Sequence, residues 1–80
     1  MENNLTAYDK VFNNLNNIKK AKYSFNVNCA TSFVTFNAKP GEFNPFNAET
    51  VYQITVAITN AGFSPRTILK GQYTLLIKLN

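Results

Sequence analysis

The sequence contains no histidine and no tryptophan, and it has one cysteine and four acidic residues in a chain of 80. Histidine, cysteine thiolates and paired carboxylates are the groups that most often transfer protons or act as nucleophiles in enzymes. Their scarcity makes catalysis a poor expectation and favours a protein that acts by binding. We therefore expect no enzymatic activity.

The same absences argue against metal and cofactor sites. Zinc sites are built mainly from cysteine and histidine, and a single cysteine cannot complete one. Calcium requires clustered carboxylates, but the acids are scattered along the chain: Glu2, Asp9, Glu42 and Glu49. The three glycines are isolated, so no glycine-rich phosphate loop is present. We expect no metal, no cofactor and no catalytic residue, with Glu42 and Glu49 as the one acid–base pair that the chain could form across a loop.

Long apolar runs are also missing. A membrane span requires about 20 predominantly apolar residues, and a secretory signal joins a basic region to an apolar stretch. Neither pattern occurs here. We expect a cytoplasmic protein without membrane contact, located in the host cytoplasm if a phage encodes it.

The lone cysteine, Cys29, cannot form a disulfide within the chain. It continues an alternating apolar pattern, so we expect it to be buried as a small hydrophobic residue. Hydrophobic residues make up 45% of the chain, including seven Phe and four Tyr. This content is too high for a disordered chain. It predicts one folded domain over residues 1–80, with fraying at residues 1–4.

Asparagine and positive charge are abundant instead. The chain has 13 asparagines and a net charge of +4. Asparagine offers hydrogen-bond donors and acceptors without charge, which suits a polar binding surface. Adenine- and thymine-rich codons explain the same bias equally well, and such a bias in a short protein is common in bacteriophages and mobile elements. The excess of basic residues favours an anionic partner.

The first predicted element is an amphipathic helix over residues 6–20. Its apolar residues recur at steps of three and four along one stripe: Tyr8, Val11, Phe12, Leu15 and Ile18. Thr6 and Asp9 resemble a capping box in which Asp9 lies in the first turn. Lys19, Lys20 and Lys22 fall at the expected carboxyl end, where the helix dipole favours cations.

The apolar period then changes from 3.6 to 2, which predicts strands. The first strand covers residues 23–29 and the second covers residues 32–38, with a hairpin centred on Ala30 and Thr31 between them. A last strand places its apolar residues on one face: Tyr73, Leu75, Ile77 and Leu79. Leu76, on its second face, favours either a central position in the sheet or a sheet whose second face is also buried. Residues 67–69 fit a short strand or a turn.

Residues 48–61 fit either a strand or a helix. Their alternating β-branched residues are typical of a strand, whereas a helix would gather the apolar residues on one stripe (Val51, Ile54, Ala57, Ile58 and Ala61). The residues at the two ends of this segment favour the helix. Asn47, or Asn44, suits the N-cap with Pro45 in the first turn, and Gly62 suits the C-terminal stop.

The resulting order α-β-β-α-β predicts an α+β fold. We expect an antiparallel or mixed sheet of three to four strands with the helices on one face. The alternative is one helix with a mostly antiparallel sheet of four to five strands. Either sheet is small enough to leave exposed edges, so a homodimer formed through an edge strand is a further expectation.

Two groups of residues are candidate binding sites. Basic side chains suited to nucleic acid or to an acidic partner form the first group: Lys19, Lys20, Lys22, Arg66 and Lys70. The second group lies in the turn-rich loop of residues 39–46, which we expect to expose Phe43, Asn44 and Phe46 to a protein partner.

We therefore expect a small protein that binds a macromolecule without catalysis. The favoured interpretation is a stoichiometric inhibitor or modulator of a host protein, of the type that phages and mobile elements encode. A patch of about 800 Å² on each partner suffices for stable recognition. The alternative is an RNA- or single-strand nucleic-acid-binding protein that uses the basic surface.

Overall fold

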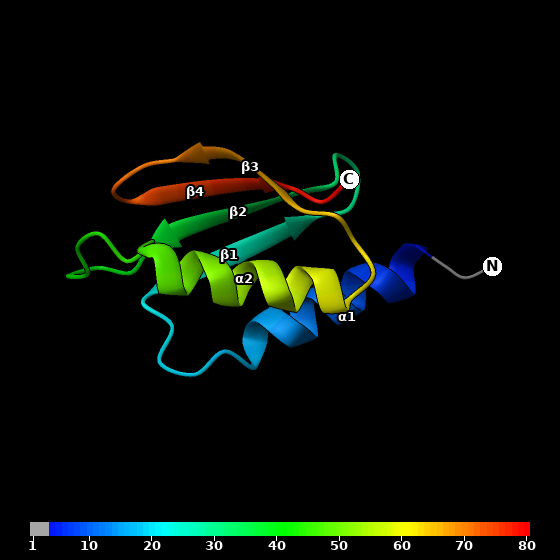
Figure 1. The fold of residues 1–80 in the computed structure, drawn as a ribbon, viewed down its shortest axis with the longest axis horizontal. Helices are drawn as coiled ribbons and strands as arrows, with labels where there is room; N and C mark the ends of the chain where they lie inside the picture. The colour runs from blue at the N-terminus through cyan, green and yellow to red at the C-terminus, as the bar shows by residue number, and fades with distance from the viewer. Residues whose placement is uncertain (1–3) are drawn as a thin grey trace.

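The computed structural model describes residues 4–80, which form two helices and four strands (Figure 1). In chain order the elements are α1 (Asn4–Asn16), β1 (Tyr23–Asn28), β2 (Phe33–Ala38), α2 (Ala48–Asn60), β3 (Arg66–Lys70) and β4 (Thr74–Lys78). The predicted α+β class and the helical interpretation of residues 48–61 are confirmed. The segment around residues 67–69 is a strand. Residues 1–3, where we expected fraying, lie outside the described residues, and Asn4 is the first residue of α1.

The strands form one antiparallel sheet in the order β1-β2-β4-β3. β4 pairs with β2 on one side and with β3 on the other, so the predicted central position of the last strand is confirmed. β1 and β3 are the edges. The register of β3 is interrupted between Thr67 and Leu69, which leaves Ile68 without a partner in the β3–β4 register.

Asn28 closes the hairpin between β1 and β2. Its Oδ1 accepts hydrogen bonds from the backbone N–H groups of Ala30 and Thr31, at 3.0 and 3.3 Å. In such an Asx turn, the asparagine side chain accepts hydrogen bonds from the backbone N–H groups that follow it, so the hairpin forms without an Asn-Gly pair. Ser32 then adopts a left-handed φ of 60° and returns the chain to β2.

The core lies between one face of the sheet and the two helices, which cover the same face (Figure 1). Alternate residues of the inner strands point into it and are almost completely buried: Val34, Phe36, Leu75 and Ile77. The helices supply Val11, Leu15, Ile54, Ala57 and Ile58. Tyr52 and Val56, which fall off the predicted stripe of α2, are exposed.

The ends of α2 follow the predicted signals. Asn47 is the N-cap, and its Oδ1 accepts a hydrogen bond of 2.9 Å from the backbone N–H of Thr50. Gly62 adopts a φ of 99°, a conformation that favours glycine and ends the helix. Pro45 lies before the N-cap, so its predicted place in the first turn was wrong.

The predicted boundaries of the first helix were wrong at both ends. α1 already includes Thr6 as an interior residue, so Thr6 is not an N-cap and Asp9 lies beyond the first turn. The helix ends at Asn16 instead of Lys20. Four nearby asparagines are weak helix formers, and Lys20 adopts a left-handed φ of 59° that turns the chain toward β1.

Two predictions of burial were also wrong. Because β1 ends at Asn28, Cys29 lies in the hairpin turn and is exposed. Phe46, expected on the surface, is only 3% exposed. Its ring packs against Tyr23 and Phe36, with centroid separations of 5.8 and 6.4 Å. Phe46 directly precedes the N-cap of α2, a position that commonly carries an apolar residue folded back onto the helix.

Within residues 4–80, no helix is long and apolar enough to cross a membrane.

Candidate binding surface

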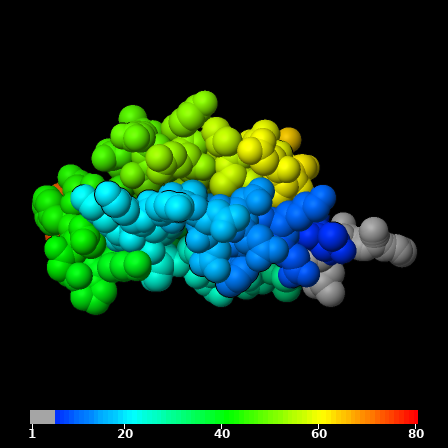
Figure 2. Space-filling model, turned by 90° about the horizontal axis from the view of Figure 1, so that it is seen from below, coloured from blue at the N-terminus to red at the C-terminus, as the bar shows by residue number. Residues whose placement is uncertain are grey.

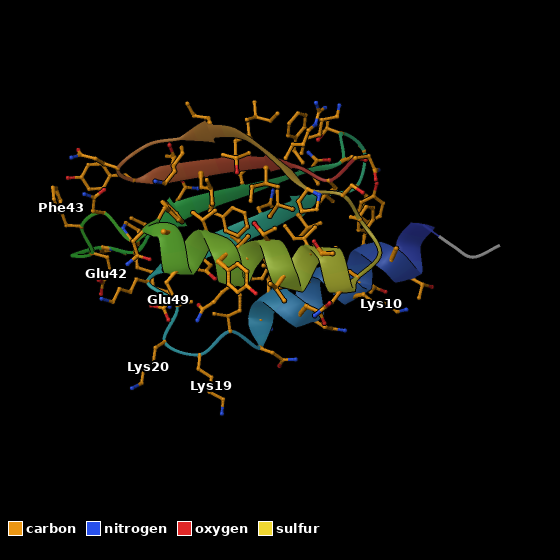
Figure 3. The ribbon with its side chains drawn as sticks, viewed as in Figure 1. Lys10, Lys19, Lys20, Glu42, Phe43 and Glu49 are labelled. Carbon is orange, nitrogen blue, oxygen red and sulfur yellow. The ribbon has the colours of Figure 1, made fainter. Side chains whose placement is uncertain are left out.

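The loop between α1 and β1 carries three of the candidate lysines. Lys19, Lys20 and Lys22 are all exposed there, on a loop and not on the last turn of a helix. Figure 3 shows the side chains of Lys19 and Lys20 extending away from the body of the molecule. Exposed lysines on a loop remain fully hydrated and free to rotate, so they are suited to contact an anionic partner.

The β hairpin adds a fourth lysine to this cluster. Tyr23 pairs with Ala38, and the backbone N–H of Lys39 donates to the carbonyl of Lys22 at 3.0 Å. Lys39 and Lys20 also border a common hollow. Lys39 was missed among the sequence candidates, although a signal existed. A hairpin centred between Ala30 and Thr31 sets residue 39 opposite residue 22.

Arg66 and Lys70 do not extend this cluster as one group. They occupy opposite ends of β3, where Arg66 pairs with Lys78 and Lys70 pairs with Leu75. Since Leu75 points into the core and Lys78 does not, the two basic side chains lie on opposite faces of the sheet. Arg66 therefore belongs with Lys78, whose Nζ lies 5.4 Å from the centroid of the Phe33 ring.

The loop between β2 and α2 exposes Phe43 and Asn44, but not Phe46. The Phe43 side chain is 65% exposed and projects from one end of the molecule (Figure 3). Its ring meets that of Tyr73 edge to face, with centroids 5.7 Å apart. Tyr73 is itself 49% exposed. Left-handed conformations at Gly41 (φ 84°) and Asn44 (φ 58°) shape the loop that carries Phe43.

Tyr73 was predicted to lie in the last strand, on the same face as Leu75 and Ile77, which was wrong. β4 begins at Thr74, so Tyr73 belongs to the turn between β3 and β4. The carbonyl of Tyr73 accepts a hydrogen bond of 2.8 Å from the N–H of Ala38 and fixes this turn beside the end of β2. Sequence periodicity misplaced this residue because the apolar alternation extends one residue before the start of β4.

The lysine loop and the aromatic loop meet at a cavity of about 120 Å³. Lys19, Lys20 and Lys22 border it from one side, and Phe43 and Asn44 border it from the other. Figure 2 shows the two segments in contact, cyan beside green. The two candidate groups that the sequence suggested separately thus share one surface. We call it the end surface, and it comprises Lys19, Lys20, Lys22, Lys39, Phe43, Asn44 and Tyr73.

Two acids lie at the same end of the molecule (Figure 3). Glu42 is half-buried in the loop before α2. Glu49 is exposed in the first turn of α2, where a carboxylate stabilises the positive end of the helix dipole. This placement gives Glu49 a structural role at the start of α2. The four lysines outnumber the two carboxylates, so the end surface stays positive overall.

Tyr23 forms part of the cavity wall and is only 3% exposed. Its hydroxyl is the one buried side-chain polar atom in the described chain that lacks a hydrogen-bond partner. Burial raises the pKa of Tyr23 above its ordinary value, so the hydroxyl keeps its proton at neutral pH.

The face of the sheet opposite the helices is a second exposed surface, here called the open sheet face. Polar residues from β1 and β2 cover one half: Ser24, Asn26, Thr35 and Asn37. Phe33, Leu69 and Leu76 lie on the other half with Arg66 and Lys78. None of the four strands in residues 4–80 contains an acid, so the charged residues of this face are all basic.

Across residues 4–80, no three side chains of the metal-binding types Asp, Glu, Cys and His come together. Comparison of the chain with protein-family models, with curated proteins and with solved structures gives no match. The end surface and the open sheet face are therefore the two candidate binding surfaces of the described residues.

Proposed function

We propose that this protein binds a protein partner through its end surface and does so without catalysis. The observation that carries the proposal is the Phe43–Tyr73 pair. Both rings are about half exposed or more, and they meet edge to face with centroids 5.7 Å apart instead of entering the core. Exposed aromatic rings held in a fixed geometry are typical anchors of protein interfaces.

Charge supports an acidic partner. Lys19, Lys20 and Lys22 border one cavity with Phe43, and Lys39 lies beside Lys22, on a chain whose net charge is +4. Lysines around an apolar anchor attract an acidic surface during encounter and orient it on arrival. The neighbouring Asn44 amide offers both a donor and an acceptor at the rim.

The mode of action that fits these features is stoichiometric. A protein of 80 residues that lacks histidine and carries one exposed anchor can act by covering a partner's site. We propose an inhibitor or modulator of a host protein, of the phage or mobile-element type, that works in the cytoplasm.

The proposal is tested by capture from a host-cell lysate treated with nuclease. Immobilised protein should retain one protein in near-equal amount, and retention should survive removal of nucleic acid. Recovery that disappears with nuclease treatment would contradict a protein partner and favour nucleic acid.

A second candidate is the binding of RNA or single-stranded nucleic acid by the open sheet face. The observation in its favour is the row formed by Phe33, Lys78 and Arg66, a ring and two cations on strands that contain no acid. Bases stack on aromatic rings, and cations neutralise phosphates. Binding of a short oligonucleotide should then weaken steeply between about 50 and 200 mM salt.

A homodimer through an edge strand would form at β1. The other edge, β3, is interrupted between Thr67 and Leu69, and such irregularities work against continuous pairing with a second chain. β1 pairs regularly along its whole length and has no such interruption. Light scattering at increasing protein concentration tests this proposal through the measured mass.

A further inference from the structure

The outer edge of β1 carries backbone groups that the sheet does not pair. Within residues 4–80, β1 pairs with β2 alone, and the N–H of Lys39 donates to the carbonyl of Lys22 just before the strand begins. Because hydrogen-bonded pairs alternate along an antiparallel ladder, every second residue from Lys22 onward points its N–H and C=O toward β2. The residues between them point these groups outward: Tyr23, Phe25 and Val27. No backbone hydrogen bond within residues 4–80 pairs the outward groups.

A groove of about 520 Å³ lies between this edge and α1, which packs against β1. We call it the β1 groove. Its apolar wall contains Phe12 of α1, which is 47% exposed, and the half-buried Phe25 of β1, with ring centroids 5.5 Å apart. Ile18 of the α1–β1 loop adds a third apolar side chain. An unpaired strand edge beside an apolar groove is suited to an extended peptide, because the edge supplies backbone hydrogen bonds and the groove accepts alternate side chains.

The charged residues that border the β1 groove are both basic. Lys20 and Lys39 lie near the start of β1, and none of the described residues that line the groove is acidic. A strand added antiparallel to β1 ends beside the start of β1, so its carboxyl end lies next to these lysines. Acidic residues at that end are attracted by both lysines, whereas a parallel strand would bring its amino end there.

We propose that β1 binds an extended acidic segment of a protein partner as a fifth strand of the sheet, antiparallel to β1. An apolar side chain of the segment lies directly opposite Phe25, on the same face of the sheet, and contacts Phe12 in the groove. Acidic residues at the carboxyl end of the segment lie beside Lys20 and Lys39. This inference rests on the proposed function, because it names the part of the partner that binds next to the end surface.

A second copy of the chain fits the same edge less well. β1 and the hairpin turn that follows it contain no acid. Pairing of β1 with a second β1 therefore brings no negative charge to Lys20 or Lys39. An acidic segment satisfies both the open backbone groups and the lysines, and it excludes the homodimer through β1 when it is bound.

The test is a titration of isotope-labelled protein with a synthetic peptide of about eight residues, in which valine alternates with threonine before two final glutamates. In the free protein, the N–H of Phe25 should exchange with solvent faster than those of Ser24 and Asn26, which point toward β2. We expect saturable amide shifts along β1 and new protection of the Phe25 N–H when the peptide binds. Absence of either result would overturn the proposal.

Methylation of single peptide nitrogens tests the backbone pairing directly. A methyl group on the nitrogen of a central valine blocks the hydrogen bond to the carbonyl of Phe25 and should weaken binding about tenfold or more. A methyl group on the neighbouring threonine nitrogen points away from β1 and should leave the affinity unchanged. Equal losses from the two methylated peptides would show that the segment does not add as a strand.

Matched protein variants test the two sides of the groove. Lys39→Gln and Lys10→Gln change the net charge equally, but Lys10 lies on α1 at the other end of the molecule (Figure 3). Only Lys39→Gln should reduce the peptide affinity, by severalfold. Phe12→Ala should also reduce it, whereas Tyr52→Ala, at an exposed ring on α2 outside the groove, should not. Equal effects of the two lysine variants would show a diffuse charge effect and overturn the assignment.

Two further outcomes identify another occupant. Protection of the Phe25 N–H that rises with protein concentration, together with a doubled mass and no response to the peptide, would show a second copy at the edge. Equal binding of a peptide with lysines in place of the glutamates would contradict an acidic segment. Capture that depends on Phe43 without peptide binding contradicts only the added strand, and peptide binding without such capture contradicts only the role of the end surface.

Discussion

Single asparagines hold parts of this fold together. Asn14 on α1 donates from Nδ2 to the carbonyl of Ala57 on α2 at 2.9 Å. That carbonyl belongs to the last turn of α2, where backbone acceptors lack partners within the helix. Asn28 closes the hairpin and Asn47 caps α2. These three asparagines therefore have structural roles that composition alone did not reveal.

The contribution of the hydrogen bond between Asn14 and α2 can be measured by comparing alanine variants at Asn14 and at the neighbouring Asn13. Replacing an exposed helical asparagine with alanine improves helix propensity by about 0.5 kcal/mol, so Asn13→Ala should stabilise the protein slightly. Asn14→Ala gains the same propensity but loses a hydrogen bond worth about 1 kcal/mol and should be less stable than Asn13→Ala. Urea unfolding compares the two free energies. Equal values would show that the Asn14 bond contributes nothing.

Tyr23 makes the free energy of unfolding depend on pH in the alkaline range. Burial raises the pKa of Tyr23 in the folded protein, so the unfolded chain loses this proton first as the pH rises. The contribution of Tyr23 is constant well below pH 10, and stability falls as the pH rises above about 10. Tyr23→Phe removes this component, and at pH 7 it should be as stable as the wild type or more stable, because the hydroxyl has no hydrogen-bond partner.

Thermal unfolding at pH 8 and pH 10.5 provides the measurement. The wild type should lose more stability between these values than Tyr23→Phe does, whereas the exposed Tyr52→Phe should behave like the wild type. Identical pH profiles for all three proteins would show that the Tyr23 hydroxyl reaches water.

At the scale of elements, helix ends marked by a capping residue could be predicted from the sequence, whereas an end marked only by weak helix formers could not. The ends of α2 were predicted correctly because Asn47 and Gly62 each impose a backbone geometry. The end of α1 was misplaced because no residue stops it sharply, and a run of weak helix formers lets tertiary contacts decide. Cys29 was misassigned for a related reason, since alternation continues one residue beyond β1.

The N-cap of α2 offers a direct check of this argument. Asn47→Ala should destabilise the protein by about 1 kcal/mol, because the N–H of Thr50 loses its acceptor. Asn47→Gly should destabilise the protein by only about 0.3 kcal/mol, because glycine is tolerated at the N-cap. Denaturant unfolding of both variants gives the two values. Equal losses would indicate that another group satisfies the Thr50 amide.

At the scale of the whole molecule, the binding surface depends on contacts that no local pattern contains. Phe43 and Phe46 lie in one loop with similar neighbours, yet only Phe43 is exposed because Phe46 enters the core beside Tyr23. The meeting of residues 19–22 with residues 43 and 44 requires α1 and α2 to pack on the same face of the sheet. The residue types of the site were predictable, but their assembly was not.

The end surface is proposed to anchor a protein partner through Phe43. The most direct test is capture from nuclease-treated lysate with a pair of matched variants. Phe43→Ala removes an exposed ring at the anchor, and Tyr52→Ala removes an equally exposed ring on α2. Neither side chain lies in the core, so both variants should fold. We expect the wild type and Tyr52→Ala to retain the same partner in equal amounts, and Phe43→Ala to lose at least about 90% of it, since hot-spot residues contribute about 2 kcal/mol or more. Undiminished capture by Phe43→Ala, or equal losses in both variants, would contradict the assignment of the end surface.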